Sequence, residues 1–272
     1  MTGRGKALVL GGGGVTGVAW ETGMLLGLAE QGIDLSDADL VVGTSAGSVV
    51  GAQLLSGVPL DDLYEAQRAG ATREIPAKIG TGFLLTFVAS AILPNGRAWL
   101  GRRALQARTV PPEERRRVIE QRIGRDVWPE TPLVVTAVEA QTGKFVTFTK
   151  NSGVSLIDAV AASCAVPLVW PPHPINGVRY IDGGARTTAN VDVARGCERL
   201  VVLAPVTGLK GRPEKQAQNL RVPYAVLAPN DLALSKMGRN PLDPAFRASA
   251  AEAGRQQAKR EAEKIRGVWL SN

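Results

Sequence analysis

The strongest chemical feature of this chain is a serine between two glycines, Gly43-x-Ser45-x-Gly47. The apolar run 39–42 leads into this motif, and the small apolar residues after it are typical of a helix. At a sharp strand-to-helix turn a serine is forced into strained backbone angles, and glycines two positions away relieve the crowding. The pattern therefore predicts a nucleophile elbow with Ser45 exposed. An ordinary turn with Ser45 as a helix N-cap also fits these residues.

Four consecutive glycines, Gly11 to Gly14, follow the apolar segment 6–10 and precede a predicted helix. Glycine N–H groups can approach an anion closely, and the start of a helix adds partial positive charge. Such a loop suits a phosphate or an oxyanion equally well. It also matches the dinucleotide fingerprint Gly12-x-Gly14-x-x-Gly17, for which the ribose ligand would be one of the acids Asp34, Asp37 and Asp39.

A third motif, Asp182-Gly183-Gly184, ends the short apolar segment 178–181. The glycines bring backbone close to the carboxylate and keep bulky side chains away from it. A hairpin turn is the alternative, because Asp-Gly is a common turn dipeptide.

A serine nucleophile usually takes its base from a histidine held by an acid. The single histidine, His173, lies between prolines in a segment predicted to be rigid and extended. Ser45, Asp158 and His173 would follow the order serine, acid, histidine. Asp158 falls in a predicted amphipathic helix, however, so a non-catalytic surface or hinge histidine is the alternative.

Taken together, Gly-Gly-Gly-x-x-Gly near the start, Gly-x-Ser-x-Gly after it and Asp-Gly-Gly well downstream resemble the patatin-like phospholipases. The resemblance extends over about residues 6–190 and includes 159–167, which is similar to the family's segment before its catalytic acid. One difference is that the family often has an arginine in the glycine loop, where this chain has Val15 and Thr16.

The resemblance implies a dyad in which Ser45 is the nucleophile and Asp182 its base. It also implies oxyanion donors and supporting glycines, at Gly12, Gly13, Gly14 and Ala46 for the oxyanion hole and at Gly43, Gly47, Gly183 and Gly184 for the elbow and the acid loop. A free carboxylate is a weak base with a pKa near ~3.9. Partial desolvation beside Ser45 would raise that pKa and strengthen the base.

The function implied is a serine acyl-ester hydrolase that cleaves phospholipid or lysophospholipid acyl bonds, with a lipid ester as substrate. The mechanism needs no metal and no organic cofactor. Two other functions remain open: a dinucleotide-binding protein that uses the glycine fingerprint, and a catalytically silent lipid-binding module that keeps the fold.

At 272 residues the chain is long enough for one large α/β domain over 1–272. The net charge of +7 fits transient contact with an anionic membrane surface. With 5% aromatic residues and no recognisable binding motif, nucleic acid is not an expected partner. Cys164 and Cys197 make no disulfide framework and no secretory signal is evident, which predicts a cytoplasmic protein. The positive charge extends this prediction to peripheral association with the membrane. No metal-ligand cluster and no oligomeric state can be recognised.

Alternating apolar and amphipathic segments predict a three-layer α/β/α fold with a mostly parallel central sheet and the elbow at a strand's carboxyl end. The expected strands are 6–10, 39–42, 132–139, 144–149, 178–181, 199–204 and 223–228. The expected helices are 15–31, 46–56, 60–69, 112–123, 155–164 and 245–266. The polar stretch 208–221 predicts a surface loop, and 246–268 predicts a solvated helix.

Residues 70–125 depart from this regular pattern. The run 82–93 is uncharged but too short to span a bilayer, which needs about 20 residues. A basic tract follows, with Arg97, Arg102, Arg103, Arg108, Arg115, Arg116, Arg117, Arg122 and Arg125. One interpretation is a buried helix followed by a solvated, arginine-rich helix. The other is a lid or lipid-contact insertion whose arginines bind anionic headgroups.

Overall fold

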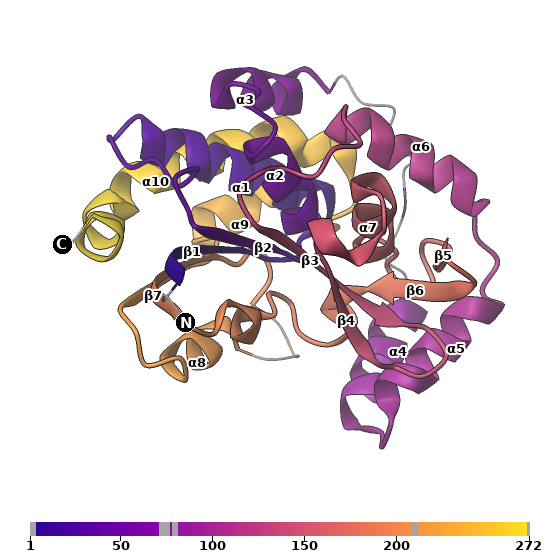
Figure 1. Cartoon of the computed structure of the whole chain (residues 1–272). Helices are drawn as coiled ribbons and strands as arrows, with labels where there is room; N and C mark the ends of the chain where they lie inside the picture. Colours follow the sequence, from indigo (N-terminus) through magenta and orange to yellow (C-terminus); the bar gives the residue numbers. More distant parts are fainter. Residues whose placement is uncertain (1–3, 71–76, 78–80, 208–211, 271–272) are drawn as a thin grey trace.

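A single mixed sheet of eight strands organises the chain, in the order β5-β6-β3-β2-β1-β7-β8, with β4 paired to β3 beside this path. The computed structural model describes residues 4–70, 77, 81–207 and 212–270. The strands are β1 (Arg4–Leu10), β2 (Leu40–Gly43), β3 (Leu133–Glu139), β4 (Phe145–Phe148), β5 (His173–Ile175), β6 (Val178–Asp182), β7 (Cys197–Leu203) and β8 (Tyr224–Leu227). Figure 1 shows β1, β2 and β3 running through the middle of the molecule.

The strands β3, β2, β1, β7 and β8 pair in parallel, whereas β4, β5 and β6 add antiparallel pairs at one end. Side chains alternate across β1, so that Leu8 and Leu10 enter one apolar cluster while Ala7 and Val9 enter another on the opposite face. A parallel sheet is stable when both faces are covered, which explains the continuous apolar runs. The predicted α/β fold with a mostly parallel sheet is confirmed.

Helices cover both faces unequally. The cluster that holds Leu8 and Leu10 is covered by α1 (Gly14–Ala29), α2 (Ala46–Leu54), α3 (Leu60–Ala69), α6 (Pro112–Ile123), α7 (Leu156–Ser163), α9 (Asp231–Met237) and α10 (Arg247–Trp269). The opposite face is covered by α8 (Pro213–Gln218), the 3-10 turn η3 (Val191–Ala194) and α5 (Gly96–Gln106), next to which α4 (Thr81–Ile92) packs. In Figure 1 the first group lies above the sheet and the second below it.

Two predictions near the C-terminus are wrong. The stretch 208–221 is not only a loop, because α8 forms within it at Pro213–Gln218; residues 208–211 lie outside the described part. The helix expected to be solvated, α10, buries a face of small and apolar residues that includes Ala251, Ala258 and Ile265. Its frequent charges hide this face, because alanine at helical spacing gives a weak amphipathic signal.

Helices α1 and α10 pack with their backbones almost in contact. A Cβ added at Gly23 would lie 2.0 Å from the Ala251 carbonyl oxygen, and one at Gly254 would lie 2.3 Å from that of Trp20. The indole of Trp20 also donates to Gln257 Oε1 at 3.3 Å. Glycine is therefore required at this seam for steric reasons, and α10 fixes the helix that carries the glycine loop at its start.

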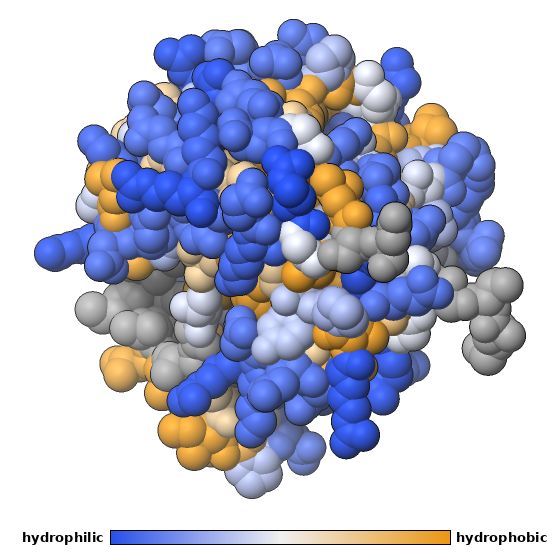
Figure 2. Space-filling view, turned by 90° about the vertical axis from the view of Figure 1, so that its left-hand side faces the viewer, coloured by the Kyte–Doolittle hydropathy of each residue, from blue (hydrophilic) through white to orange (hydrophobic). Residues whose placement is uncertain are grey.

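The region 81–125 forms three helices. Some of its apolar side chains are buried and others are exposed to solvent. Leu85 and Ile92 on α4 are 71% and 79% exposed, whereas Phe87 packs towards the cluster around α5. The predicted insertion 70–125 also includes 71–76 and 78–80, which lie outside the described residues. In the part of the chain that is described, no helix has the length and apolarity that a membrane crossing requires. On the face shown in Figure 2, hydrophilic side chains predominate and hydrophobic ones form small separate groups.

Candidate active site

Ser45 occupies the strained turn that its motif predicts. It follows β2, precedes α2, and has φ of 52° and ψ of −116°, a backbone conformation that side chains rarely adopt. A Cβ at Gly47 would lie 2.1 Å from the Leu10 carbonyl oxygen, and one at Gly43 would lie 2.5 Å from the Ser48 Cα. Both glycines are thus required by close backbone approach. Ser45 stands at the N-cap position of α2, but its side chain makes no capping hydrogen bond, so this is not an ordinary turn with a capping serine.

Hydrogen bonds to its backbone hold Ser45 in this strained conformation. The Ser45 N–H donates to Ser163 Oγ at 2.8 Å, which fastens the elbow to the end of α7. The Ser45 carbonyl oxygen accepts from Ser48 Oγ at 2.6 Å and from Cys164 Sγ at 3.3 Å. Cys164 is buried, and burial raises the pKa of its thiol to about 11, so it stays protonated and acts as a donor.

Asp182 ends β6 and meets the serine. A hydrogen bond from the Ser45 hydroxyl is one of the influences that lower the pKa of its carboxyl, and the Gly184 N–H donates to Asp182 Oδ1 at 2.7 Å. The carboxyl is buried, and burial raises its pKa to about 6 even though both hydrogen bonds lower it. A Cβ at Gly183 would lie 2.3 Å from Thr136 Oγ1, so this glycine lets the acid loop pass directly over β3.

The glycine loop lies beside Ser45, but its donors are not equivalent. A Cβ built on Gly12 would be 3.5 Å from the Ser45 Cβ, which places the loop against the nucleophile. The Gly12 N–H, however, donates to the Thr188 carbonyl at 2.7 Å and is already engaged. In the described part of the chain, the N–H groups of Gly13, Gly14 and Ala46 donate to no protein acceptor. Gly12 therefore serves to place the loop, and the other three predicted positions keep donors available.

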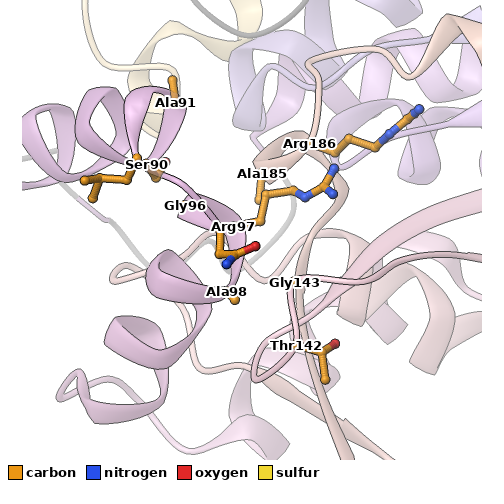
Figure 3. A pocket seen from close by; sticks show the side chains of 11 residues that line it. Ser90, Ala91, Gly96, Arg97, Ala98, Thr142, Gly143, Ala185 and Arg186 are labelled. Carbon is orange, nitrogen blue, oxygen red and sulfur yellow. The ribbon is translucent and has the colours of Figure 1, made fainter.

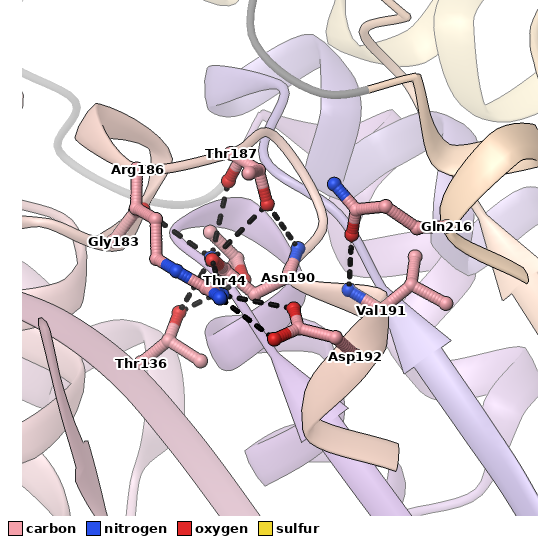
Figure 4. A network of polar contacts seen from close by, with 9 residues as sticks. All are labelled: Thr44, Thr136, Gly183, Arg186, Thr187, Asn190, Val191, Asp192 and Gln216. Atoms are coloured by element: carbon pink, nitrogen blue, oxygen red, sulfur yellow. Dashed lines mark hydrogen bonds and ion pairs between the residues drawn. The ribbon is translucent and has the colours of Figure 1, made fainter. Parts of the chain in front are cut away.

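A buried amide ties the segments of the site together beneath the dyad. Asn190 Nδ2 donates to Thr44 Oγ1 at 3.1 Å beside the elbow, to Thr136 Oγ1 at 3.3 Å on β3, and to the Gly183 carbonyl at 3.2 Å on the acid loop. Arg186 Nη1 donates to Asn190 Oδ1 at 3.0 Å (Figure 4). This polar floor, Thr44, Thr136, Gly183, Arg186 and Asn190, is absent from the sequence prediction, because a lone asparagine in a loop gives no sequence signal.

The histidine-dependent triad does not form. His173 Nε2 pairs with Asp158 Oδ1 at 2.9 Å, so the predicted acid and histidine do meet, but the Ser45 hydroxyl bonds Asp182 instead. His173 is 4% exposed, so it is not a surface histidine. Burial lowers the pKa of its imidazole, although Asp158 raises it. The pair joins β5 to α7 and is structural.

A small cavity opens onto the serine. It holds about 20 Å³, the room of roughly one water molecule. Its lining mixes apolar and cationic side chains: Gly14, Val15, Val18, Ser45, Ala46, Arg115, Arg122, Cys164, Val166, Trp170 and Leu242. An adjoining cavity of about 130 Å³ shares Val15, Val18 and Arg122 as walls and is lined further by Val49 and Leu63. An ester must therefore displace part of the lining before it reaches Ser45.

Arg115 is a site residue that the sequence prediction placed only in a basic tract. It is 5% exposed on α6, and its guanidinium lies 4.3 Å from the centre of the Trp170 ring. Its neighbours differ, since Arg116 pairs with Asp158 at 2.8 Å and Arg117 is exposed. Three consecutive arginines look alike in sequence, and only helical phase distinguishes them.

A wider hollow of about 480 Å³ lies beyond the acid loop and does not include the dyad. Figure 3 shows it between Ser90 at the end of α4 and Arg97 at the start of α5 on one side, and Gly143 and Arg186 on the other. Its Arg186 is already paired with Asp192 at 2.6 Å. The hollow is open and polar, so the smaller cavity is the one that matters for chemistry at Ser45.

The glycines offer little to a dinucleotide. The Thr16 N–H has no acceptor within α1, because it lies in the first turn, and it donates to the Pro241 carbonyl at 3.2 Å. A Cβ at Gly14 would lie 2.4 Å from the same oxygen, so the segment around Pro241 covers the turn where a pyrophosphate would bind. Among the residues that the structure describes, no group of three or more His, Cys, Asp or Glu side chains could hold a metal ion.

A strained serine at a strand-to-helix turn, hydrogen-bonded to a buried carboxyl, is typical of an α/β serine hydrolase. The family model for patatin-like phospholipases matches residues 8–195, and the chain belongs to this family, whose members are lipid acyl hydrolases. The helices α8, α9 and α10 lie entirely outside the matched range.

One solved structure with a TM-score above 0.5 agrees with this fold, and two others are similar at lower scores. VipD from Legionella pneumophila is 14% identical with a TM-score of 0.51, and the match covers 96% of this chain and 67% of that one. The type III effector ExoU is 16% identical with a TM-score of 0.45, and the chain spans 53% of its length. ExoU of Pseudomonas aeruginosa, in complex with SpcU, matches at 17% identity with a TM-score of 0.43.

Proposed function

We propose that this protein is a serine acyl-ester hydrolase that cleaves phospholipid or lysophospholipid acyl bonds with Ser45 and Asp182. The observation that carries the proposal is the strained Ser45 at the turn after β2, whose hydroxyl lowers the pKa of the buried Asp182 carboxyl through a hydrogen bond. Unengaged N–H groups beside it supply what an acyl-transfer site needs. Family membership supports the lipid class of the substrate.

In the first half of the reaction, Asp182 takes the Ser45 proton as Ser45 Oγ attacks the ester carbonyl. The N–H groups of Gly13, Gly14 and Ala46 are the candidates for holding the tetrahedral oxyanion, at roughly 3 kcal/mol each in comparable sites. The ester C–O bond then breaks, and Asp182 returns the proton to the departing alcohol or lysolipid. Its raised pKa suits both transfers, because it brings the acid closer to neutral pH.

In the second half, Asp182 takes a proton from a water molecule, which attacks the acyl-enzyme carbonyl. The same donors hold the second oxyanion, the bond to Ser45 Oγ breaks, and the proton passes to that oxygen. The fatty acid leaves and the dyad is restored. No step requires a metal or an organic cofactor. The adjoining cavity with Val18 and Val49 in its wall is the candidate acyl site.

The decisive experiment is intact-mass analysis after exposure to a long-chain fluorophosphonate, with peptide mapping. One adduct on Ser45, lost in Ser45→Ala, together with fatty-acid release from lysophospholipid, is the expected result. A folded protein that binds lipid vesicles but shows neither adduct nor release would instead be a silent lipid-binding module. Cofactor titration followed by tryptophan fluorescence tests the dinucleotide alternative in the same preparation.

Transient contact with an anionic membrane is part of this proposal, as is a cytoplasmic location with peripheral association. The net charge of +7 and the exposed Leu85 and Ile92 on α4 support it. We expect the double substitution Leu85→Ser and Ile92→Ser to weaken vesicle binding while turnover of a short soluble ester is unchanged. Equal vesicle binding by this variant and the wild type would remove α4 from the contact.

A further inference from the structure

The cavity that adjoins the Ser45 cavity has a buried acceptor in its wall that a plain alkyl chain cannot satisfy. Gln53 on α2 is 8% exposed, and its Oε1 finds no donor among the residues that the structure describes. Its Nε2 donates to the Arg122 carbonyl at 2.7 Å. Because a carbonyl oxygen can only accept, this bond fixes the orientation of the amide and leaves Oε1 without a partner. Covering such an acceptor with apolar atoms is unfavourable.

A second buried glutamine in the same wall differs from Gln53. Gln67 on α3 is 4% exposed, and its Oε1 accepts from Arg247 Nε at 3.2 Å and from Arg247 Nη2 at 2.9 Å. Its acceptor is therefore satisfied within the protein. Of these two amides in a cavity of about 130 Å³, Gln53 is the one that keeps an acceptor for a group entering the cavity.

Gln53 lies on the path that leads away from the nucleophile. Ser45, Val49 and Gln53 follow one another at intervals of four residues, a spacing that places them along one side of the helix that Ser45 begins. Ser45 lines the small cavity, Val49 and Gln53 line the adjoining one, and Val15 and Val18 on α1 line both. Eight residues of helix span roughly 12 Å. An extended eighteen-carbon chain that starts at Ser45 and follows α2 would therefore pass Gln53 near its middle.

We propose that Gln53 is a specificity-determining residue of this site and selects acyl chains that carry a hydroxyl group near the middle. The hydroxyl would donate to Gln53 Oε1, whereas an unsubstituted chain would cover this acceptor and leave it unsatisfied. A hydroxyl is a small neutral donor, so the rest of the chain can still contact Val18 and Val49. The proposal rests on the proposed function, because it concerns the acyl chain of the ester that Ser45 attacks.

The test compares lysophosphatidylcholines whose acyl chains differ at one carbon. The chains are 12-hydroxystearoyl, 12-methoxystearoyl and stearoyl, and calorimetric binding is measured on full-length Ser45→Ala protein so that no turnover is needed. We expect the hydroxylated chain to bind at least ~5-fold more tightly than stearoyl, as one added hydrogen bond to a buried acceptor predicts. The methoxy chain should gain nothing, because an ether oxygen cannot donate. A 3-hydroxystearoyl chain should also gain nothing, because its hydroxyl lies next to the ester.

Two substitutions at Gln53 separate the acceptor from the rest of the side chain. Gln53→Met and Gln53→Glu both lose the N–H that bonds the Arg122 carbonyl, but Gln53→Glu keeps oxygen atoms that can accept. Added to Ser45→Ala, Gln53→Met should abolish the preference for the hydroxylated chain, and Gln53→Glu should retain it. Gln121→Met is the matched control, because Gln121 lines the same cavity from an exposed position on α6, and it should retain the preference.

The comparison of the three chains in the parent protein decides the matter even if Gln53→Met fails to fold. Equal affinity for the hydroxy, methoxy and stearoyl chains would overturn the proposal. So would an undiminished preference in a folded Gln53→Met protein, or an equal gain from the 3-hydroxy chain.

Turnover separates this inference from the proposed function. In an active protein, a mixture of the 12-hydroxystearoyl and stearoyl esters should release the hydroxy acid with a kcat/KM at least ~5-fold higher, and Gln53→Met should remove the difference. A protein that binds the hydroxylated chain through Gln53 but hydrolyses neither ester would support the inference and refute the hydrolase. Equal kcat/KM for the two esters in an active protein would overturn the inference and leave the hydrolase in place.

Discussion

Two aspartates in this molecule have opposite electrostatic environments. Asp182 is buried beside neutral donors, the Ser45 hydroxyl and the Gly184 N–H, and its pKa is raised to about 6. Asp158 is half-buried, and hydrogen bonds from Arg116, His173 and Ser155 outweigh burial, so its pKa lies below its usual value. The same side chain is thus poised to exchange a proton in one place and held ionised in the other.

The contrast shows how a base can be recognised without a histidine beside it. A carboxyl surrounded by cations is stable as an anion and has little tendency to take a proton. A carboxyl held by neutral donors in a buried loop accepts one more readily. Position in the chain does not separate the two, since either acid could be drawn into a plausible serine, acid and base arrangement.

The largest effect is expected from the dyad. Ser45→Ala and Asp182→Asn should each lower kcat/KM for a lysophospholipid by at least ~10⁴-fold, because members of a catalytic unit act together. Asp158→Asn should change it by less than about threefold, since a group outside the unit supplies no transition-state contact. Steady-state kinetics on proteins with matched circular dichroism spectra makes the comparison. Comparable losses in Asp158→Asn and Asp182→Asn would break the distinction between the two acids.

The polar floor should give the next largest effect. Asn190→Ala removes the amide that bonds Thr44 and the Gly183 carbonyl, so the elbow and the acid loop lose a shared support. We expect kcat to fall roughly 10- to 100-fold through misplacement of the dyad. Unfolding should become easier by about 1–3 kcal/mol, because buried groups lose their partner. Asn219→Ala at an exposed position is the matched control for urea denaturation and kinetics.

The pH profile should follow Asp182 rather than Asp158. Because Asp182 must be ionised to take the serine proton, kcat/KM should rise with pH and level off above about 6. Asp158→Asn should leave the pH of this rise in kcat/KM unchanged. Arg115→Gln should move it to higher pH, because the guanidinium lowers the pKa of Asp182. If the pH at which kcat/KM rises changed in Asp158→Asn and not in Arg115→Gln, Asp182 would not be the acid that controls the rise.

The smallest effect is expected from the Asp158–His173 pair. His173→Gln should leave turnover within about threefold and cost about 1–3 kcal/mol of stability at neutral pH. His173 has a lowered pKa when folded, so the unfolded chain binds a proton more readily and the folded state loses stability as pH falls below the ordinary histidine range. Asp158, with its lowered pKa, adds to this loss under more acidic conditions.

Asp182 has the opposite sign, because its raised pKa favours the folded state at low pH and costs stability as pH rises through about 6. Thermal unfolding of the two variants across pH 4 to 8 distinguishes the pair from the dyad acid: His173→Gln should flatten the acid-side loss, whereas Asp182→Asn should raise stability at the alkaline end.

The alternating strands and helices and the three motifs could be predicted from the sequence. The bounds of α3 and α6 agree with the predicted 60–69 and 112–123. The strained conformation of Ser45 follows from Gly43 and Gly47, because only a sharp turn needs glycine at both positions. The contact between Ser45 and Asp182 could be expected only through the family resemblance, since 136 residues of unknown path lie between them.

The site features that could not be predicted from the sequence depend on contacts between distant segments of the chain. Arg115 looks no different from Arg116 and Arg117 until helix phase places it inward, and Asn190 acquires its role from three partners on other segments. The Gly12 N–H is the reverse case. A glycine in a predicted donor loop turned out to be engaged by Thr188, which no local pattern indicates.

The close seam between α1 and α10 also sets an order of events during synthesis. The glycine loop opens α1, near the start of the chain, yet the backbone that packs against α1 lies at Arg247–Trp269. Ribosomes add about 5–20 residues per second, so roughly 4–17 s separate the emergence of Asp182 from that of Trp269. During this interval the elbow and the acid loop are present on the nascent chain while the helix behind the glycine loop lacks its partner. The three motifs are therefore present before the site is complete. The glycine loop gains its support only after α10, which follows all three motifs, has been synthesised and packs against α1.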